Sequence, residues 1–176
     1  MEPSERVVAG HGSAVWRVCR GLLNEHDAED AWADTFAAAL AAWGRSDQNA
    51  NVRGWLVTIA HRKAIDVLRH RARDPLPVET VPERPSRYGV PGARDLDLWA
   101  ALATLPPRQR AAVVHHHLGG LPYDEIAQLT GTTAAAARRA ASDGVARLRA
   151  VLDPRPNPPQ HPSRESTSPE PTEEAP

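Results

Sequence analysis

Residues 54 to 73 read GWLVTIAHRKAIDVLRHRAR, and this stretch decides both the fold class and the first functional hypothesis. At helical spacing its apolar side chains gather on one face and its polar side chains on the other. The apolar face takes Leu56, Val57, Ala60, Ala64, Val67 and Leu68, and the polar face takes Trp55, Thr58, Arg62, Asp66, Arg69 and Arg73, flanked by Lys63 and His70. A basic stripe headed by an aromatic ring suits a nucleic-acid strand, which offers phosphates to arginine and base faces to rings. A solvated surface helix has the same pattern, so the rest of the chain must decide between the two.

Composition indicates an all-α protein. Alternating β-branched residues are absent, there are one Phe and two Tyr, and alanine is abundant. Prolines gather in residues 74–91 and again in residues 154–176, which is typical of a linker and a tail. We therefore expect two small helical domains, residues 1–73 and 94–153, joined by a Pro-rich linker at 74–93 and followed by a disordered, acidic, Pro-rich tail at 154–176.

Charge is segregated along the chain although the net charge is only −1. Residues 24–36 carry five acids and no Lys or Arg, whereas residues 44–73 carry seven bases against Asp47 and Asp66. An acidic helix that precedes a basic one indicates two different partners, or one partner with two surfaces.

Several classes of function are disfavoured. The single cysteine, Cys19, excludes an intrachain disulfide and a cysteine metal cluster. Neither a run of apolar residues long enough to span a membrane nor a signal peptide is present, so we expect a cytoplasmic protein without a membrane partner. No acid pair, nucleophile–base set or phosphate loop suggests an enzyme, and we expect no cofactor. Consecutive helical residues point about 100° apart, so His115, His116 and His117 cannot converge on one metal ion and are expected at a partly exposed helix end.

The apolar spacing predicts helices over residues 5–22, 28–43, 55–73, 93–105, 108–118, 122–129 and 133–152. Asp27 is the expected N-cap of the second helix, which buries Ala31, Trp32, Thr35, Phe36, Ala39, Leu40 and Trp43. Residues 44–53 are expected to form a polar loop. Pro106 and Pro107 end one helix and open the next, and Gly119 and Gly120 end that one.

The last two predicted helices have the spacing of a helix-turn-helix. A short helix (122–129) and a longer one (133–152) are joined at Thr130-Gly131-Thr132. The expected core of the motif is Ile126, Leu129, Ala134, Ala137, Ala141, Val145 and Leu148. Arg139 and Arg147 then point outward, with Arg138 at the edge. An ordinary αα-hairpin in a helical bundle has the same turn chemistry and stays open as an alternative.

Together the two blocks resemble bacterial sigma factors of the extracytoplasmic-function (ECF) type, which belong to the sigma-70 family. The motif Asp27-Ala28-Glu29-Asp30-Ala31 with Thr35-Phe36 is similar to the acidic helix of sigma region 2. The motifs that follow resemble the promoter-melting helix and then region 4: Trp55-Leu56, Ile59-Ala60 and Ala64-Ile65-Asp66-Val67-Leu68-Arg69, then Leu105-Pro106, Arg108-Gln109-Arg110 and Tyr123-Asp124-Glu125-Ile126-Ala127 with Gly131. The resemblance implies a sigma region 2-like bundle (1–73) and a region 4-like helix-turn-helix domain (94–153).

The resemblance also implies partners and contact residues. The chain would bind core RNA polymerase at the β′ clamp helices and the β flap, direct it to promoter DNA and perform no chemistry itself. An anti-sigma protein is a further candidate partner. The implied polymerase contacts are Asp27, Glu29, Asp30 and Asp34. The implied −10 contacts are Asn51, Trp55, Thr58, Arg62, Lys63, Arg69 and Arg73, and the implied −35 contacts are Tyr123, Arg138, Arg139, Ser142 and Arg147.

The chain departs from the family pattern at several positions. His61-Arg62 stands where the family often has Arg-Asn, and residues 44–53 lack the usual aromatic. The recognition helix carries Ala135-Ala136-Ala137 and Asp143, so we expect weak or unusual −35 recognition, because alanine cannot donate a hydrogen bond to a base. Two alternatives therefore stay open. One is a degenerate sigma-like adaptor that binds polymerase without promoter melting, and the other is a helix-turn-helix regulator that binds duplex DNA, with residues 1–73 as a sensory or dimerising domain.

Overall fold

The computed structural model describes residues 3–43, 51–73 and 93–153, and every regular element within these ranges is helical. The elements are α1 (Pro3–Leu22), α2 (Glu25–Ala42), α3 (Val52–Arg73), α4 (Ala93–Thr104), α5 (Pro107–Val113), the π-helical turn η2 (Val114–Leu118), α6 (Tyr123–Thr130) and α7 (Ala134–Leu152). The all-α prediction is confirmed. The expected tail, the loop residues 44–50 and residues 74–92 of the expected linker lie outside the described residues.

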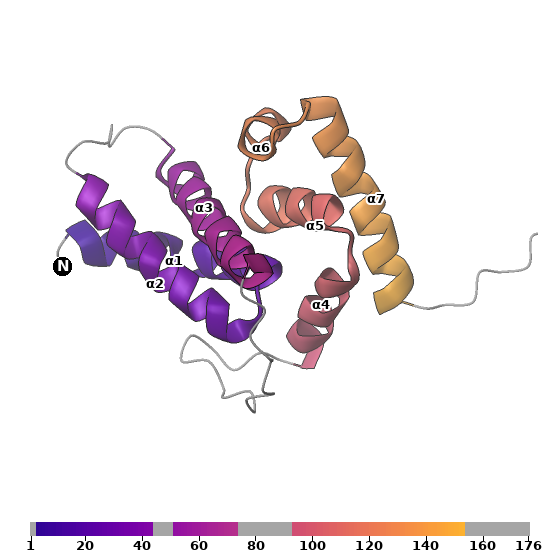
Figure 1. Cartoon of the computed structure of the whole chain (residues 1–176), viewed down its shortest axis with the longest axis horizontal. Helices are drawn as coiled ribbons and strands as arrows, with labels where there is room; N and C mark the ends of the chain where they lie inside the picture. The colour runs from indigo at the N-terminus through magenta and orange to yellow at the C-terminus, as the bar shows by residue number, and fades with distance from the viewer. Residues whose placement is uncertain (1–2, 44–50, 74–92, 154–176) are drawn as a thin grey trace, which may run out of the picture.

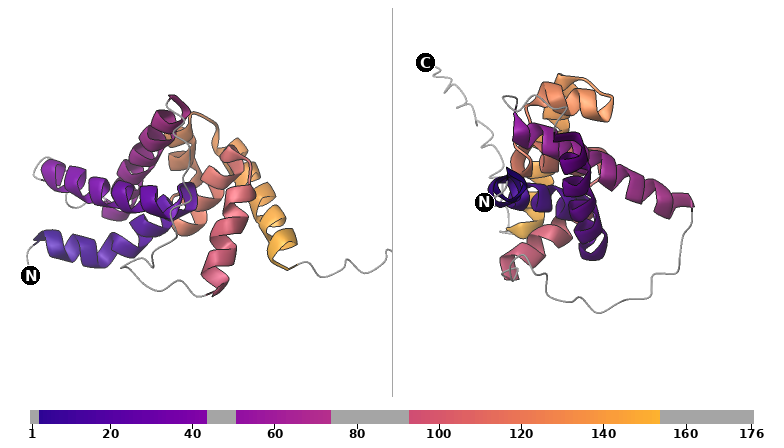
Figure 2. Two further views of the ribbon diagram at one scale, coloured as in Figure 1. Left: turned by 60° about the horizontal axis from the view of Figure 1, so that its bottom comes forward. Right: turned by 90° about the vertical axis from the view of Figure 1, so that its left-hand side faces the viewer.

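The helices form two units that lie side by side (Figure 1). In the first, α1, α2 and α3 each pack against the other two, and in the second α7 packs against α4, α5 and α6. The two units also contact each other, because α1 packs against α4, α5 and η2. The C-terminal half of α3 projects beyond both units, as Figure 2 shows, and its last residues are exposed.

The start of α2 differs from the prediction. Asn24 rather than Asp27 is the N-cap, since Asn24 has extended backbone dihedrals and its Oδ1 accepts a hydrogen bond from the Asp27 amide at 2.9 Å. The prediction placed the cap three residues too late, because Leu23 is still buried in α1 packing and leaves Asn24 as the first residue free to cap. The predicted loop was also too long at its C-terminal end, because α3 already begins at Val52.

In the second unit, Pro107, Gly119 and Gly131 lie at helix ends. Pro107 occupies the first turn of α5, as expected. The helix predicted over 108–118 changes to π-type hydrogen bonding at Val114, and the Gly119 amide donates to the Val114 carbonyl at 2.8 Å. Gly131 follows α6 with φ 68°, the left-handed conformation that glycine adopts readily, and Thr133 then caps α7.

A continuous core cluster joins the two units. Leu56 and Val18 of the first unit belong to it, and so do Leu102, Leu121 and Ile126 of the second. Two predicted core positions are wrong. Leu40 is 48% exposed, because α2 is packed on its α1 and α3 side and Leu40 lies outside that contact, and Leu68 is 42% exposed because it lies on the projecting half of α3.

The helix-turn-helix forms largely as predicted. Its expected core positions Ile126, Ala137, Ala141 and Leu148 are buried, whereas Leu129, Ala134 and Val145 are partly buried. None of the helices in the described ranges combines the length and the apolar character needed to cross a membrane.

Candidate nucleic-acid interface

Asn51 organises the start of α3 instead of projecting freely. Its Oδ1 accepts a hydrogen bond from the Gly54 amide at 3.0 Å, and its carbonyl accepts one from the Trp55 amide at 3.0 Å. A Cβ at Gly54 would lie 2.6 Å from Asn51 Nδ2, so a larger residue at position 54 would displace the Asn51 side chain from this capping arrangement. Asn51 is exposed and lies next to Trp55, at the N-terminal end of the polar face of α3.

Trp55 and Thr58 form the head of the polar face of α3. The Trp55 ring is partly buried and lies 6.0 Å, centroid to centroid, from the ring of Trp43 at the end of α2, tilted by 53°. The Thr58 hydroxyl donates to the Gly54 carbonyl at 2.9 Å, which leaves its oxygen as an acceptor. The ring of Trp43 therefore helps to position the Trp55 side chain.

The cations of α3 that follow Arg53 fall into two groups. Arg62, Arg69 and Arg73 are exposed, and of these Arg69 has an ion pair with Asp66 at 4.0 Å. Two others are turned toward α2. Lys63 Nζ lies 3.6 Å from Asp34, and Arg71 Nη2 lies 2.8 Å from Asp27.

The Lys63–Asp34 pair connects a predicted polymerase contact with a predicted DNA contact, whereas Asp27 pairs with Arg71, which was not among the predicted contacts. Asp27 retains 12% side-chain exposure, while Asp34 retains 67%. Asp30 is exposed and lies 4.0 Å from His26, and Glu29 is partly buried. The acidic face of α2 thus offers Glu29 and Asp30 outside the contacts with α3, and Asp27 and Asp34 within them.

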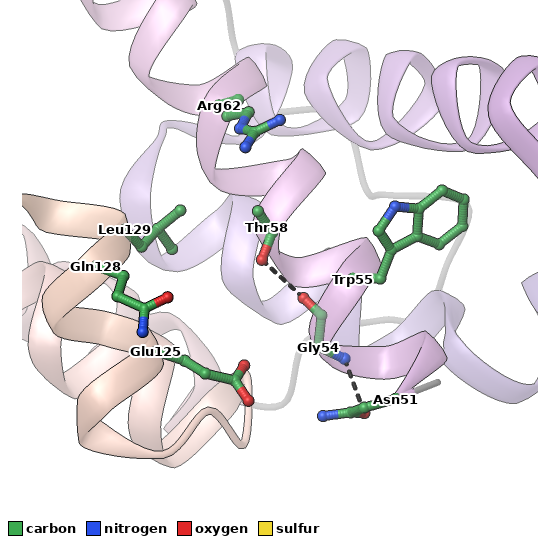
Figure 3. Close-up of a pocket in the computed structure, with 8 residues that line it drawn as sticks. All are labelled: Asn51, Gly54, Trp55, Thr58, Arg62, Glu125, Gln128 and Leu129. Atoms are coloured by element: carbon green, nitrogen blue, oxygen red, sulfur yellow. Dashed lines mark hydrogen bonds between the residues drawn. The ribbon is translucent and has the colours of Figure 1, made fainter. Parts of the chain in front are cut away.

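A polar cleft of about 370 Å³ separates α3 from α6 (Figure 3). Its α3 side carries Thr58 and Arg62, and its α6 side carries Glu125 and Gln128. In Figure 3 the Glu125 and Gln128 side chains point from α6 toward α3, and the Trp55 ring points away from α6. The remaining lining residues are Asn51, Gly54, Trp55 and Leu129.

The predicted −35 residues lie along the exposed side of α6 and α7. The Arg138 guanidinium lies 5.3 Å above the centre of the Tyr123 ring, and His116 stacks on Tyr123 at 4.0 Å and 19°. A cation over an aromatic face is held by the ring's quadrupole, so Tyr123 positions Arg138 at the first turns of α7. Arg139, Ser142 and Arg147 are exposed along the same helix.

The first turn of α7 has few side chains that can donate hydrogen bonds. Ala135 and Ala136 are exposed where α7 begins, and the exposed Asp143 lies between the arginines. The α7 N-terminus itself offers backbone amides, which together with the helix dipole favour phosphate. This surface can therefore contact the DNA backbone but has few groups that could read base edges.

His61 and His115 form a buried pair that was not predicted from the sequence. His115 is fully buried, which contradicts its expected place at a partly exposed helix end, because the π-helical turn directs it inward against α3. Its Nε2 lies 3.1 Å from Nδ1 of His61, which is 8% exposed. Spacing offered a signal for His61, since it lies between the buried residues Val57 and Ala64 at i−4 and i+3.

Burial acts on the titration of both rings. It lowers the pKa of His115 to about 4, with a further contribution from His61. It also lowers the pKa of His61, and the cations Arg62 and Arg69 lower it further. Both rings are therefore neutral at pH 7. Within the described residues no group of three or more His, Cys, Asp or Glu side chains could hold a metal ion.

Two family models match this chain. The model of sigma-70 region 2 matches residues 7–74, and the model of sigma-70 region 4 matches residues 95–148. The first covers most of α1 and all of α2 and α3, and the second covers most of α4 to α7.

The curated relatives of this chain are also sigma factors. The chain is 33% identical to the ECF RNA polymerase sigma factor SigE of Mycolicibacterium smegmatis over 84% of this chain and 61% of that protein. It is 33% identical to the RNA polymerase sigma factor CarQ of Myxococcus xanthus over 77% of this chain and 80% of that protein. The chain thus spans less than two thirds of the SigE relative and about four fifths of CarQ.

Two solved structures share the fold. The sigma factor RpoE of Bartonella quintana, solved with the anti-sigma factor NepR, superposes with a TM-score of 0.68 and 26% identity, covering 84% of this chain and 95% of that one. CnrH, solved with the cytosolic domain of CnrY, superposes with a TM-score of 0.61 and 25% identity, covering 86% of this chain and 88% of that one.

Proposed function

The chain belongs to the ECF sigma factors of the sigma-70 family, non-enzymatic factors that bind RNA polymerase and direct transcription initiation, and we propose how its own surfaces divide that work. In this proposal α2 docks on the β′ clamp helices of core polymerase and the second unit reaches the β flap. The α3 face captures the non-template strand of the −10 element, and the first turns of α7 meet the −35 element. A sigma factor acts where polymerase transcribes, so its place is the cytoplasm.

The strand-binding role of α3 rests on one observation, the exposed arginine row beside a positioned tryptophan. Arg62, Arg69 and Arg73 are exposed along a projecting helix, and Trp55 is partly buried against Trp43 at its head. Backbone cations combined with a stacking ring are the elements that single-strand binding needs. Asn51 and Thr58 add polar groups beside the ring, and Lys63 adds a further cation.

Docking on polymerase is assigned to the acidic face of α2. Glu29 and Asp30 are the first contacts in this proposal because neither has an ion pair with α3 within the described residues. Asp27 and Asp34 join after their contacts with Arg71 and Lys63 are exchanged for polymerase cations. Charges at the rim of an interface set the encounter rate and the register more than the affinity.

Run-off transcription with core polymerase tests the proposal. We expect the chain to pull down core polymerase and to produce transcripts with discrete starts from a library of genomic fragments. The variant Arg62→Ala/Arg69→Ala/Arg73→Ala should still bind core polymerase but lose open complexes. The variant Glu29→Ala/Asp30→Ala should instead weaken the binding of core polymerase itself. Absence of polymerase binding would contradict the proposal and favour a helix-turn-helix regulator of duplex DNA.

A second candidate is a sigma-like adaptor that binds polymerase without melting promoters. The observation that favours it is the donor-poor start of α7, where Ala135 and Ala136 are exposed. Polymerase binding without promoter-directed initiation in the same assay would support the adaptor. The RpoE relative was solved with the anti-sigma factor NepR, so an anti-sigma partner that covers α2 or α3 is part of the proposal for this chain.

A further inference from the structure

The two units meet along a seam that is packed like a protein interior. A Cβ at Gly21 of α1 would lie 2.7 Å from the Val114 side chain, and one at Gly119 would lie 3.1 Å from Val57 of α3. At the exposed edge of the same seam, the Arg53 guanidinium donates to the Leu118 carbonyl at 3.1 Å. Apolar contact this close leaves no room for water, so any polar group within it must find its partner in the protein.

His61 of α3 and His115 of η2 are the ionisable pair whose side chains contact each other across the seam within the described residues. Nδ1 of His115 contacts the Ala111 carbonyl, which can only accept, so this nitrogen carries the hydrogen. Nε2 of His115 is then an acceptor, and it receives the hydrogen bond from Nδ1–H of His61 at 3.1 Å. Protonation of His115 Nε2 would force His61 to shift its own hydrogen from Nδ1 to Nε2, and the resulting imidazolium would be fully buried in the seam, where burial disfavours a charge.

The surrounding charges do not favour an imidazolium here. On α3 itself, Arg62 and Arg69 act on His61 as cations. The titratable groups on the neighbouring elements include Cys19 and Arg20 of α1, Arg110 of α5 and His116 of η2, and none of these is a carboxylate. The carboxylate of Glu125 on α6 lies 3.4 Å from the Cβ position of Gly54, about two helical turns, or about 10 Å, along α3 from His61.

We propose that the His61–His115 contact is a pH-sensitive latch that holds the two units together and opens the seam when His115 is protonated. Closing the seam keeps Glu125 and Gln128 of α6 opposite Thr58 and Arg62 of α3, so the closed form covers one side of the proposed strand-binding face. Opening separates the units and uncovers that side. The latch does not depend on the DNA contacts proposed above, because it concerns only packing within the chain.

The direction and size of the effect follow from proton linkage. The pKa of His115 is lowered from 6.5 to about 4 in the closed form and returns toward 6.5 once the seam opens. The open form therefore binds more protons between these two values, and the closed form loses stability as the pH falls from about 6.5 toward 4. From His115 alone, the ratio of closed to open molecules should fall about tenfold between about pH 7.5 and pH 5.5.

Single-molecule energy transfer on the full chain measures this ratio. The exposed positions Ala33 on α2 and Ala146 on α7 accept dyes as Ala33→Cys and Ala146→Cys. Cys19 stays unlabelled, because it is buried and burial raises the pKa of its thiol to about 12. We expect a low-transfer population to grow about tenfold relative to the high-transfer one as the pH falls, while far-UV circular dichroism stays helical.

Matched variants separate the latch from general acid effects. His61→Leu/His115→Leu fills similar space without a titrating group and should keep its distance distribution within about twofold over the same range. His26→Gln, which removes an exposed histidine of α2, should behave like the parent chain. An unchanged distribution in the parent chain, or an equal shift in the double variant, would overturn the latch. NMR titration of the unmodified chain adds a test without any variant: an apparent His115 pKa between about 4 and 6.5 that follows the growth of the low-transfer population supports the latch, and one that stays at about 4 or at 6.5 contradicts it.

Discussion

The helices α3 and α7 both face nucleic acid in the proposed function, but their exposed surfaces offer different chemistry. On α3, Arg62, Arg69 and Arg73 are exposed along a helix whose C-terminal half projects, and Trp55 lies near its N-terminal end. α7 begins with exposed alanines and carries Asp143 among its arginines. Single-strand capture needs cations and stacking rings, whereas reading a duplex needs donors and acceptors aimed at base edges. In the proposed function, this difference would make promoter selectivity depend more on the melted strand than on the −35 duplex.

The largest effect should come from removing the α3 arginines. We expect Arg62→Ala/Arg69→Ala/Arg73→Ala to weaken binding to a single-stranded −10 oligonucleotide by about 30-fold or more at low salt. The slope of log K against log salt should become shallower by about 2, because each lost phosphate contact on a single strand contributes about 0.7. Fluorescence anisotropy over a KCl series measures both quantities.

Arg149→Ala is the matched control for this experiment, since Arg149 is an exposed arginine near the end of α7. It should leave strand binding unchanged. An equal loss in both variants would mean that net charge, and not the α3 surface, governs the affinity, and the comparison between α3 and α7 would fail.

The α7 arginines should have a smaller effect on a different substrate. We expect Arg138→Ala/Arg139→Ala to reduce binding to a −35 duplex by about tenfold, in the lower part of the range for base and phosphate contacts. The loss should be nearly the same on specific and scrambled duplexes, because the surface offers backbone contacts rather than base readout. Electrophoretic mobility shifts with the full chain on both duplexes measure it, and a loss confined to the specific duplex would show that α7 does read sequence.

Tyr123 should act through Arg138. Tyr123→Ala removes the ring beneath the guanidinium and should weaken duplex binding about threefold, the size of an exposed cation–π contact. Tyr123→Phe keeps the ring and should bind like the parent chain. In the Arg138→Ala background, Tyr123→Ala should have no further effect, and an additive loss would show that Tyr123 contacts DNA directly.

The smallest expected effect concerns the cleft between α3 and α6. Glu125→Gln removes a carboxylate that points toward α3, so single-strand binding should strengthen about twofold, since exposed charges are strongly screened. Asp124→Gln is the control, because Asp124 is a neighbouring exposed acid that does not line the cleft. Equal strengthening by both variants would assign the effect to overall charge.

Local sequence patterns were sufficient to predict most helices and the helix-turn-helix. Gly131 marked its turn, and Pro107 marked the start of α5, because both residues have restricted or special backbone preferences. Asp27 was misassigned as a cap because Asn24 and Asp27 are both good capping residues and only the packing of Leu23 distinguishes them. Leu40 and Leu68 fit the helical period, but the period does not reveal where neighbouring helices end.

The long-range features of the candidate site could not be predicted from periodicity. His61 and His115 are 54 residues apart, and their contact depends on the π-helical turn η2, which shifts the inward direction of that helix. The ion pairs between α2 and α3 are of the same kind. Charge segregation predicted two surfaces, yet the structure places Asp34 against Lys63 and Asp27 against Arg71.

Those two ion pairs have a thermodynamic consequence for how this sigma factor assembles with its partners. In the proposed function, a polymerase cation that bound Asp34 or Asp27 would release Lys63 or Arg71 for DNA, and a phosphate that bound either cation would release the matching acid for polymerase. Coupling between two binding sites is reciprocal, so each partner would raise the affinity for the other by the same factor. The Asp27–Arg71 pair, whose carboxylate is 12% exposed, should carry more of this cooperativity than the solvent-screened Lys63–Asp34 pair.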